Sequence, residues 1–120
     1  LPYIYVRPKP NEHGLGNQIE GHFEKGMKTV IVEDLISTGK SSLQVVDVVK
    51  NAGLEVMGMV SIFTYGFHIA EKACQDAGLD SVSLTNYPVL IDLAIERGLV
   101  RAEDQNTLLN WRSNPSEWGK

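Results

Sequence analysis

Hydrophobic and polar positions follow two different periods along the chain, and each period predicts a different kind of element. Runs of β-branched and aromatic residues predict strands. They lie at Tyr3–Val6, Lys28–Val32, Val56–Phe63 and Val82–Leu84. The run from Lys28 to Val32 is almost continuously apolar, which is typical of a strand covered on both faces.

Between and after these strands, apolar residues recur at helical spacing. The predicted helices are Leu43–Ala52, closed by Gly53; Ile69–Ala77, closed by Gly78; Tyr87–Arg97; and Ala102–Arg112. This alternation predicts an α/β fold: an open, mainly parallel sheet flanked by helices, with right-handed crossovers. Such sheets bind ligands beyond the carboxyl ends of their strands, so functional residues are expected directly after each predicted strand.

The composition narrows the classes of function. The 120 residues suit a single domain spanning positions 1–120, and the formal net charge is −4. A nucleic-acid-binding protein usually carries a basic surplus, so nucleic acid is not expected as a partner. The longest strongly apolar stretch, of about eight residues from Met57, is far shorter than a membrane span. The single cysteine, Cys74, is expected in the core and fits a reducing compartment, so a cytoplasmic location is expected.

The segment that follows the second strand carries the clearest chemistry. Residues 33–42 read Glu-Asp-Leu-Ile-Ser-Thr-Gly-Lys-Ser-Ser and lead directly into a helix. Backbone N–H groups from Ser37 to Ser41 are able to surround a phosphate, because Gly39 permits positive φ and the helix N-terminus is partly positive. Glu33 and Asp34 suit hydrogen bonds from sugar hydroxyls. Serine and threonine are also ordinary helix caps, but the whole run favours a ribose 5-phosphate site.

A nucleotide-binding P-loop is a competing interpretation of Gly39-Lys40-Ser41. That motif requires its first glycine five residues before Gly39, at position 34. Position 34 is an aspartate, whose carboxylate would repel a phosphate. The P-loop interpretation is therefore excluded.

Residues 31–41, Ile-Val-Glu-Asp-Leu-Ile-Ser-Thr-Gly-Lys-Ser, resemble the motif that binds phosphoribosyl pyrophosphate (PRPP) in the type I phosphoribosyltransferases. The preceding loop, residues 7–20, is long and irregular and is expected to be a mobile catalytic loop. Its start, Arg-Pro-Lys-Pro-Asn-Glu-His-Gly at 7–14, resembles the Arg-Lys-x-x-Lys-x-His-Gly pattern of the orotate phosphoribosyltransferases, and Ile19-Glu20-Gly21 also fits. The resemblance covers Tyr3 to about Phe67.

This resemblance implies a glycosyltransferase that converts PRPP and orotate to orotidine 5′-monophosphate and pyrophosphate in pyrimidine biosynthesis. It implies Mg²⁺ held mainly through PRPP, with no dedicated protein metal site, and a homodimer that shares the mobile loop between subunits. It also implies that the chain lacks the N-terminal region of the family, since it opens at Leu1 inside a predicted strand. The implied PRPP-binding residues are Glu33, Asp34, Leu35, Ile36, Ser37, Thr38, Gly39, Lys40 and Ser41. The implied catalytic residues are Arg7, Lys9, Asn11, His13 and Asp34, and the implied orotate-binding residues are Ser37 and Tyr65.

The chain departs from the family pattern at three positions. Pro8 and Asn11 stand where the pattern has lysines, and Tyr65 stands near the place of an arginine that many members direct at the orotate carboxylate. Asn11 cannot place a positive charge on a departing pyrophosphate, although the nearby Lys9 supplies a cation. Two alternatives therefore stay open: a PRPP-binding regulatory module without turnover, and a phosphoribosyltransferase for another base.

Overall fold

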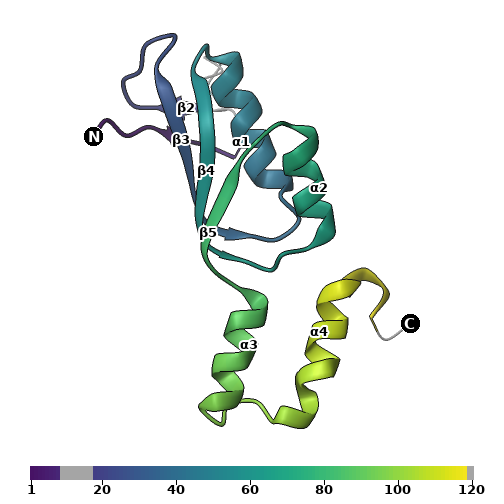
Figure 1. Cartoon of the computed structure of the whole chain (residues 1–120). Helices are drawn as coiled ribbons and strands as arrows, with labels where there is room; N and C mark the ends of the chain where they lie inside the picture. Colours follow the sequence, from purple (N-terminus) through teal and green to yellow (C-terminus); the bar gives the residue numbers. More distant parts are fainter. Residues whose placement is uncertain (9–17, 119–120) are drawn as a thin grey trace.

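The structure, a computed structural model, describes residues 1–8 and 18–118 (Figure 1). Its centre is a parallel sheet in the order β3 (Lys28–Ile36), β4 (Glu55–Thr64) and β5 (Ser81–Asn86). Helices α1 (Lys40–Asn51) and α2 (His68–Asp76) form the crossovers between these strands and lie on the same side of the sheet. The predicted α/β architecture with a mainly parallel sheet is confirmed.

The hydrophobic core lies between this sheet and the two crossover helices. Buried side chains from all these elements and their connections meet there; they are Ile31, Ile36, Val46, Val49, Leu54, Met59, Ala70, Cys74 and Leu79. The expected core position of Cys74 is confirmed, and burial raises the pKa of its thiol.

The opposite face of the sheet is exposed, which differs from the expected strand covered on both faces. Its apolar side chains are between 42% and 83% exposed; they are Val30, Val32, Val60, Ile62, Val82 and Leu84. The apolar run at Lys28–Val32 is real, but the described residues cover one of its two faces.

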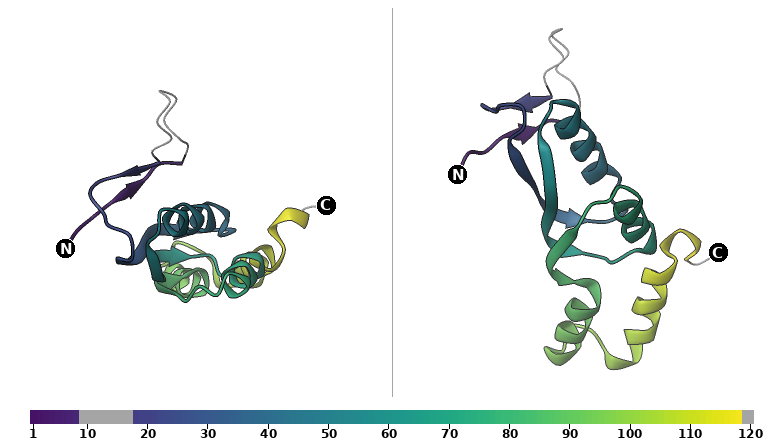
Figure 2. Two further views of the ribbon diagram at one scale, coloured as in Figure 1. Left: turned by 90° about the horizontal axis from the view of Figure 1, so that it is seen from above. Right: turned by 45° about the horizontal axis from the view of Figure 1, so that its top comes forward.

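The first predicted strand is not part of the parallel sheet. β1 (Tyr5–Val6) pairs antiparallel with the short β2 (Ile19–Glu20), and this hairpin forms a separate two-stranded sheet (Figure 2). Two-residue strands such as β2 are too short to show any hydrophobic period. The hairpin holds together the two ends of residues 9–17, which lie outside the described residues.

The chain after β5 forms a helical unit beyond the carboxyl ends of the strands (Figure 1). It comprises α3 (Tyr87–Glu96), the 3₁₀ turn η1 (Ala102–Asp104), α4 (Gln105–Ser113) and the 3₁₀ turn η2 (Pro115–Glu117). Asn86 caps α3 by accepting a hydrogen bond from the Val89 N–H, at 3.1 Å. The radius of gyration is 17.5 Å, against about 14 Å for a compact domain of this length. No helix within residues 1–8 and 18–118 is long and apolar enough to cross a membrane.

Candidate functional site

The turn from β3 to α1 has the backbone geometry of an anion-binding loop. Gly39 is the N-cap of α1 and has φ of 83°, in the left-handed region that favours glycine. It is buried against α2, where a Cβ at this position would lie 3.5 Å from Ala70 Cα. The Leu43 N–H donates to the Gly39 carbonyl at 3.0 Å, which closes the first turn of the helix.

The N-terminus of α1 is left open toward solvent. Its N-cap residue, Gly39, has no side chain to cap it, the Lys40 N–H donates to Thr38 Oγ1 at 3.4 Å, and the first turn contains no acidic residue. Ser37, Thr38 and Ser41 are exposed around it, so the hydroxyls of Ser37 and Ser41 and the N–H groups of Ser41 and Ser42 are available to a ligand. Free N–H groups and the helix dipole together favour a phosphate at this position.

The two carboxylates before this turn point to opposite faces of β3, as adjacent residues of a strand do. The Glu33 carboxylate lies on the helix-covered face and accepts a hydrogen bond from Ser42 Oγ at 3.2 Å. Asp34 is exposed, and its Oδ1 accepts the Leu35 N–H at 2.7 Å. The structure therefore leaves Asp34 open to a ligand and engages Glu33 with α1.

Tyr65 lies directly beside the phosphate-binding turn. Its N–H donates to the Ile36 carbonyl at 3.2 Å, and Ile36 immediately precedes Ser37. The structure thus brings together the two residues predicted to contact orotate, Ser37 and Tyr65, at the carboxyl edge of the sheet. The Tyr65 ring stacks on Phe67, with ring centroids 5.1 Å apart.

Of the residues predicted to act on the loop, the structure describes only Arg7. Arg7 directly follows β1, and its guanidinium donates to the Glu20 carboxylate on β2. The Arg7 N–H also donates to the Gln18 carbonyl at 2.7 Å. Lys9, Asn11 and His13 lie outside the described residues.

The described part of the chain contains no cluster of three or more His, Cys, Asp or Glu side chains arranged to hold a metal ion.

Comparison with known proteins relates this geometry to one enzyme family. No protein-family profile matches the chain. Over 98% of its length, however, the chain is 51% identical to the orotate phosphoribosyltransferase of Bacteroides fragilis, of which it covers 56%. The chain belongs to the orotate phosphoribosyltransferase family. It spans about half the length of the curated relatives that it matches.

Solved structures of orotate phosphoribosyltransferases agree with this assignment. The enzyme from Aeropyrum pernix is similar over 82% of this chain and 53% of its own, with 28% identity and a TM-score of 0.66. The Mycobacterium tuberculosis enzyme, solved in complex with PRPP, is similar over 57% of this chain and 41% of its own. In that comparison the identity is 32% and the TM-score is 0.51.

Sequence reasoning about this family member missed one residue at the site. Arg112, on α4, places its guanidinium beside Gly66, the residue after Tyr65; a Cβ at Gly66 would lie 3.2 Å from Arg112 Nη1. The two residues are far apart in the chain, so no local pattern predicts their contact. A single arginine within a predicted amphipathic helix gives no signal of its own.

Proposed function

We propose that the protein transfers the 5-phosphoribosyl group of PRPP to orotate, forming orotidine 5′-monophosphate and pyrophosphate. The observation that carries this proposal is the turn at Gly39. It opens an uncapped helix N-terminus toward solvent directly after an exposed carboxylate, in a chain about half identical to known orotate phosphoribosyltransferases. Phosphate donors beside an acceptor for sugar hydroxyls suit a ribose 5-phosphate.

Different residues of the described chain bind different parts of the substrates. The N–H groups and hydroxyls of residues 37–41 bind the 5′-phosphate. Asp34, whose carboxylate is exposed, accepts hydrogen bonds from the ribose hydroxyls. Glu33 contributes to this site indirectly, because its carboxylate accepts a hydrogen bond from Ser42 in the first turn of α1. The base lies near Ser37 and Tyr65.

Catalysis then depends on placing positive charge where negative charge grows, as pyrophosphate leaves an oxocarbenium-like ribose. Arg7, Lys9, Asn11 and His13, all within residues 7–20, close over the leaving group. In that position Arg7 exchanges its contact with Glu20 for the pyrophosphate. Mg²⁺, when bound, would neutralise negative charge on the pyrophosphate, and its ligands would come mainly from substrate oxygens.

The working enzyme is a cytoplasmic homodimer in which residues 7–20 of one subunit reach the site of the other. The hairpin stem supports this assignment, because β1 and β2 form their own sheet and are not pinned within the central one.

The substitution Asp34→Asn tests the ribose assignment. The amide keeps an oxygen for the Leu35 N–H, so the fold should survive, while the charge that binds the ribose hydroxyls is removed. Hydrogen bonds to a charged group contribute roughly 1.5–3 kcal/mol, so the affinity for PRPP should fall about 10- to 100-fold. Calorimetric titration with PRPP measures the affinity, and orotate consumption with PRPP and Mg²⁺ measures turnover.

Asp47→Asn is the matched control, because Asp47 is exposed on α1 away from the turn. It removes the same charge and should leave both measurements unchanged. Wild-type affinity for PRPP in Asp34→Asn would contradict the ribose assignment. Binding of PRPP by the wild-type chain without orotate consumption would instead favour the regulatory module.

A further inference from the structure

A cavity of about 380 Å³ lies between the end of β4 and the helical unit that follows β5. Its walls are mostly aromatic; the lining residues are Tyr65, Tyr87, Thr107, Leu108, Trp111 and Trp118. Small-molecule sites typically have volumes of about 300–1,000 Å³ and apolar or aromatic walls with a few polar groups. Here the hydroxyl and indole N–H groups of the lining side chains supply such polar groups.

Contacts among the aromatic rings hold the walls of the cavity in place. Tyr65 stacks on Phe67 with ring centroids 5.1 Å apart, and Trp111 meets both rings edge to face, with centroids 5.8 Å away. The Tyr87 hydroxyl donates to the Leu108 carbonyl at 3.2 Å and so joins α3 to α4 beside the cavity. The cavity is therefore already formed, and a planar ring that enters it meets the faces and edges of fixed rings.

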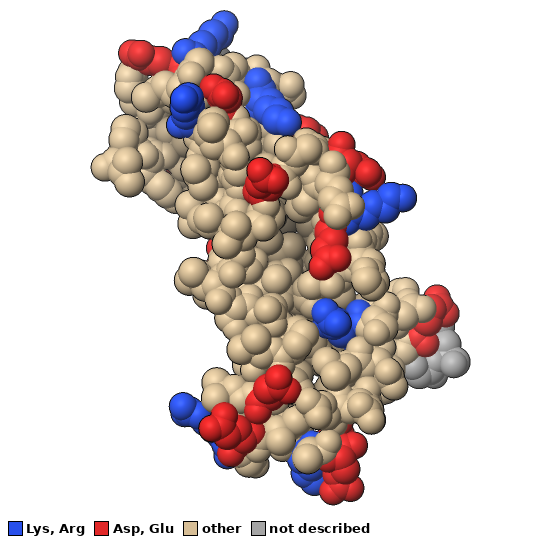
Figure 3. Space-filling model, in the orientation of Figure 1, with Lys and Arg blue, Asp and Glu red and all other residues tan. Residues whose placement is uncertain are grey.

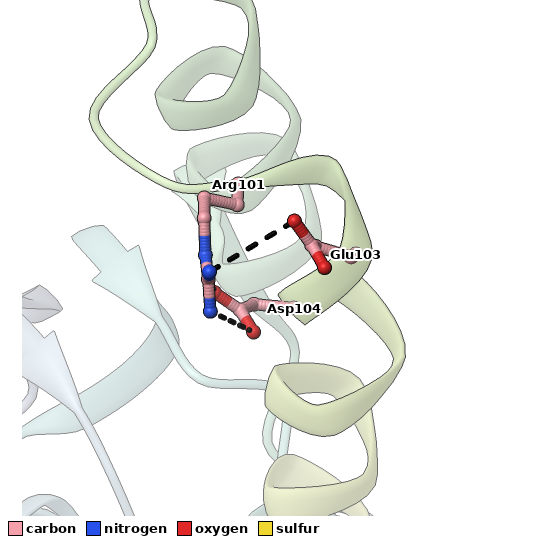
Figure 4. A network of polar contacts seen from close by, with 3 residues as sticks. All are labelled: Arg101, Glu103 and Asp104. Carbon is pink, nitrogen blue, oxygen red and sulfur yellow. Dashed lines mark hydrogen bonds and ion pairs between the residues drawn. The ribbon is translucent and has the colours of Figure 1, made fainter.

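Among the described residues, no charged side chain lines the cavity. Arg112 follows Trp111 in the chain, but its guanidinium lies beside Gly66, where an added Cβ would be 3.2 Å from Nη1. Arg101 pairs within its own turn: Nε lies 3.0 Å from Asp104 Oδ2, and Nη1 lies 3.9 Å from Glu103 Oε1 (Figure 4). An anion would lose its hydration in the cavity without gaining a charged partner, so the walls favour an uncharged ligand.

Tyr65 separates this cavity from the site proposed for the substrates. Its backbone N–H donates to the Ile36 carbonyl, directly before Ser37 of the phosphate-binding turn. Its ring, in contrast, packs among Phe67, Tyr87 and Trp111 and forms part of the cavity wall. Orotate and PRPP are both anions, which the uncharged walls disfavour. The cavity therefore suits neither substrate.

We propose that this cavity is a second ligand site, for an uncharged planar ring that carries hydrogen-bonding groups. The ring packs against Trp111 and Trp118, and its polar edge meets the Thr107 hydroxyl. This inference goes beyond the proposed function, because it assigns to the helical unit a ligand of a different chemical class from either substrate.

Benzamide and benzoate test the class of ligand, since they have the same ring and nearly the same shape but differ in charge. Both tryptophans of the chain line the cavity, so a change in tryptophan fluorescence reports its occupancy. We expect benzamide to bind with a dissociation constant of about 1 mM or below. Benzoate should bind about 10-fold more weakly or less. Saturating PRPP and orotate should not displace benzamide.

Two variants test the location of the site by calorimetric titration with benzamide. Thr107→Phe, at an exposed position of α4, places a ring in the cavity and should abolish binding. Trp118→Ala removes one wall and should weaken binding about 5- to 150-fold, the effect of losing one stacked aromatic side chain. Tyr5→Ala is the matched control, because Tyr5 on β1 is 49% exposed and Trp118 is 51% exposed. It should bind benzamide as the wild-type chain does.

Three results would each overturn the inference and leave the proposed function intact: no binding of benzamide, equal affinities for benzamide and benzoate, or wild-type affinity for benzamide in Thr107→Phe. Displacement of benzamide by orotate would also overturn it, because the cavity would then be the orotate site itself. A chain that binds benzamide as expected but neither binds PRPP nor consumes orotate would contradict the proposed function alone.

Discussion

Gly39 combines two requirements that no other residue type meets at once. Its φ of 83° lies where an L side chain meets the following carbonyl oxygen, and its backbone forms the wall of the phosphate-binding turn. The space around it is not the main constraint, since a Cβ would make an ordinary contact of 3.5 Å with Ala70 Cα. The backbone conformation therefore decides which residue can stand here.

Replacing Gly39 with alanine should lower the free energy of unfolding by about 1–2 kcal/mol, the cost of a left-handed L residue. It should also weaken PRPP binding, because relief of this strain rotates the N–H groups that face the phosphate. Urea denaturation measures the stability, and calorimetry measures the affinity.

Gly78→Ala separates the two effects. Gly78 ends α2 with φ of 64° and has no atom within 4 Å of an added Cβ, so it carries similar strain far from the turn. It should lose a similar amount of stability and keep the wild-type affinity for PRPP. Equal loss of affinity in both variants would mean that Gly39 acts through stability alone.

The sequence predicted this turn because its parts are consecutive. The strand, the carboxylates, Gly39 and the helix start lie within about a dozen residues, and their chemistry follows from local backbone geometry. Arg112 could not be predicted in the same way, because its meeting with Gly66 depends on how α3 and α4 fold back toward the sheet. Side chains alternate along a strand, so a predicted strand that continued past Val32 would have placed Glu33 and Asp34 on opposite faces of the sheet.

The position of α4 relative to the sheet matters most for the proposed base site. None of the residues of α4 is buried, so side-chain packing attaches this helix only weakly to the rest of the molecule. The Tyr87 hydroxyl donates to the Leu108 carbonyl at 3.2 Å and connects the start of α3 to the middle of α4. This bond helps to position Trp111 and Arg112, which follow on the same helix.

Tyr87→Phe removes the bond and keeps the ring in its cluster. A neutral hydrogen bond contributes about 1 kcal/mol, so amide protons of α4 should exchange about fivefold faster. Amide protons of α1, which packs on the sheet independently, should exchange at the wild-type rate. Hydrogen exchange measured residue by residue checks both, and uniform acceleration across the chain would contradict a local role.

Alkaline pH should act through the same hydroxyl. Burial first, and then Tyr65, raise the pKa of Tyr87 above 10.0, although Arg112 opposes them. A raised pKa in the folded state gives stability that is complete below pH 10.0 and is lost as pH rises through the folded value. The wild-type chain should thus lose protection of α4 above pH 10, and Tyr87→Phe should show no such step.

The sequence predicted the helices and the parallel strands, but it did not predict the residues at which they begin and end. β3 extends to Ile36, beyond the predicted end at Val32, because β4 pairs with it as far as Thr64. The last predicted helix divides into η1 and α4, since the chain turns at Asp104. These limits depend on pairing and packing partners, which a hydrophobic period does not contain.

The whole molecule is defined by a sheet with two unlike faces. Helices cover one face, and the other presents Val32, Val60 and Val82 side by side, paired in register across all three strands. In Figure 3 the left side of the molecule, over the strands, is mostly uncharged, whereas charged side chains lie at both ends and along the right side. A contiguous apolar face of this kind promotes association between molecules. The sequence could not reveal it, because a buried and an uncovered apolar strand have the same residues.

We therefore expect the weight-average mass of the 120-residue chain in sedimentation equilibrium to rise with protein concentration, as the apolar faces of two molecules meet. Val60→Lys places a charge at the centre of the valine row, where it would be desolvated in any face-to-face contact. Because Val60 is 42% exposed, lysine can extend its ammonium into solvent without disturbing the fold. The mass of this variant should stay constant over the concentration range in which the wild-type mass rises. Leu99→Lys, at a residue 80% exposed but away from the sheet, should behave as the wild-type chain does. A wild-type mass independent of concentration, or equal behaviour of the two lysine variants, would show that the open face of the sheet does not drive association.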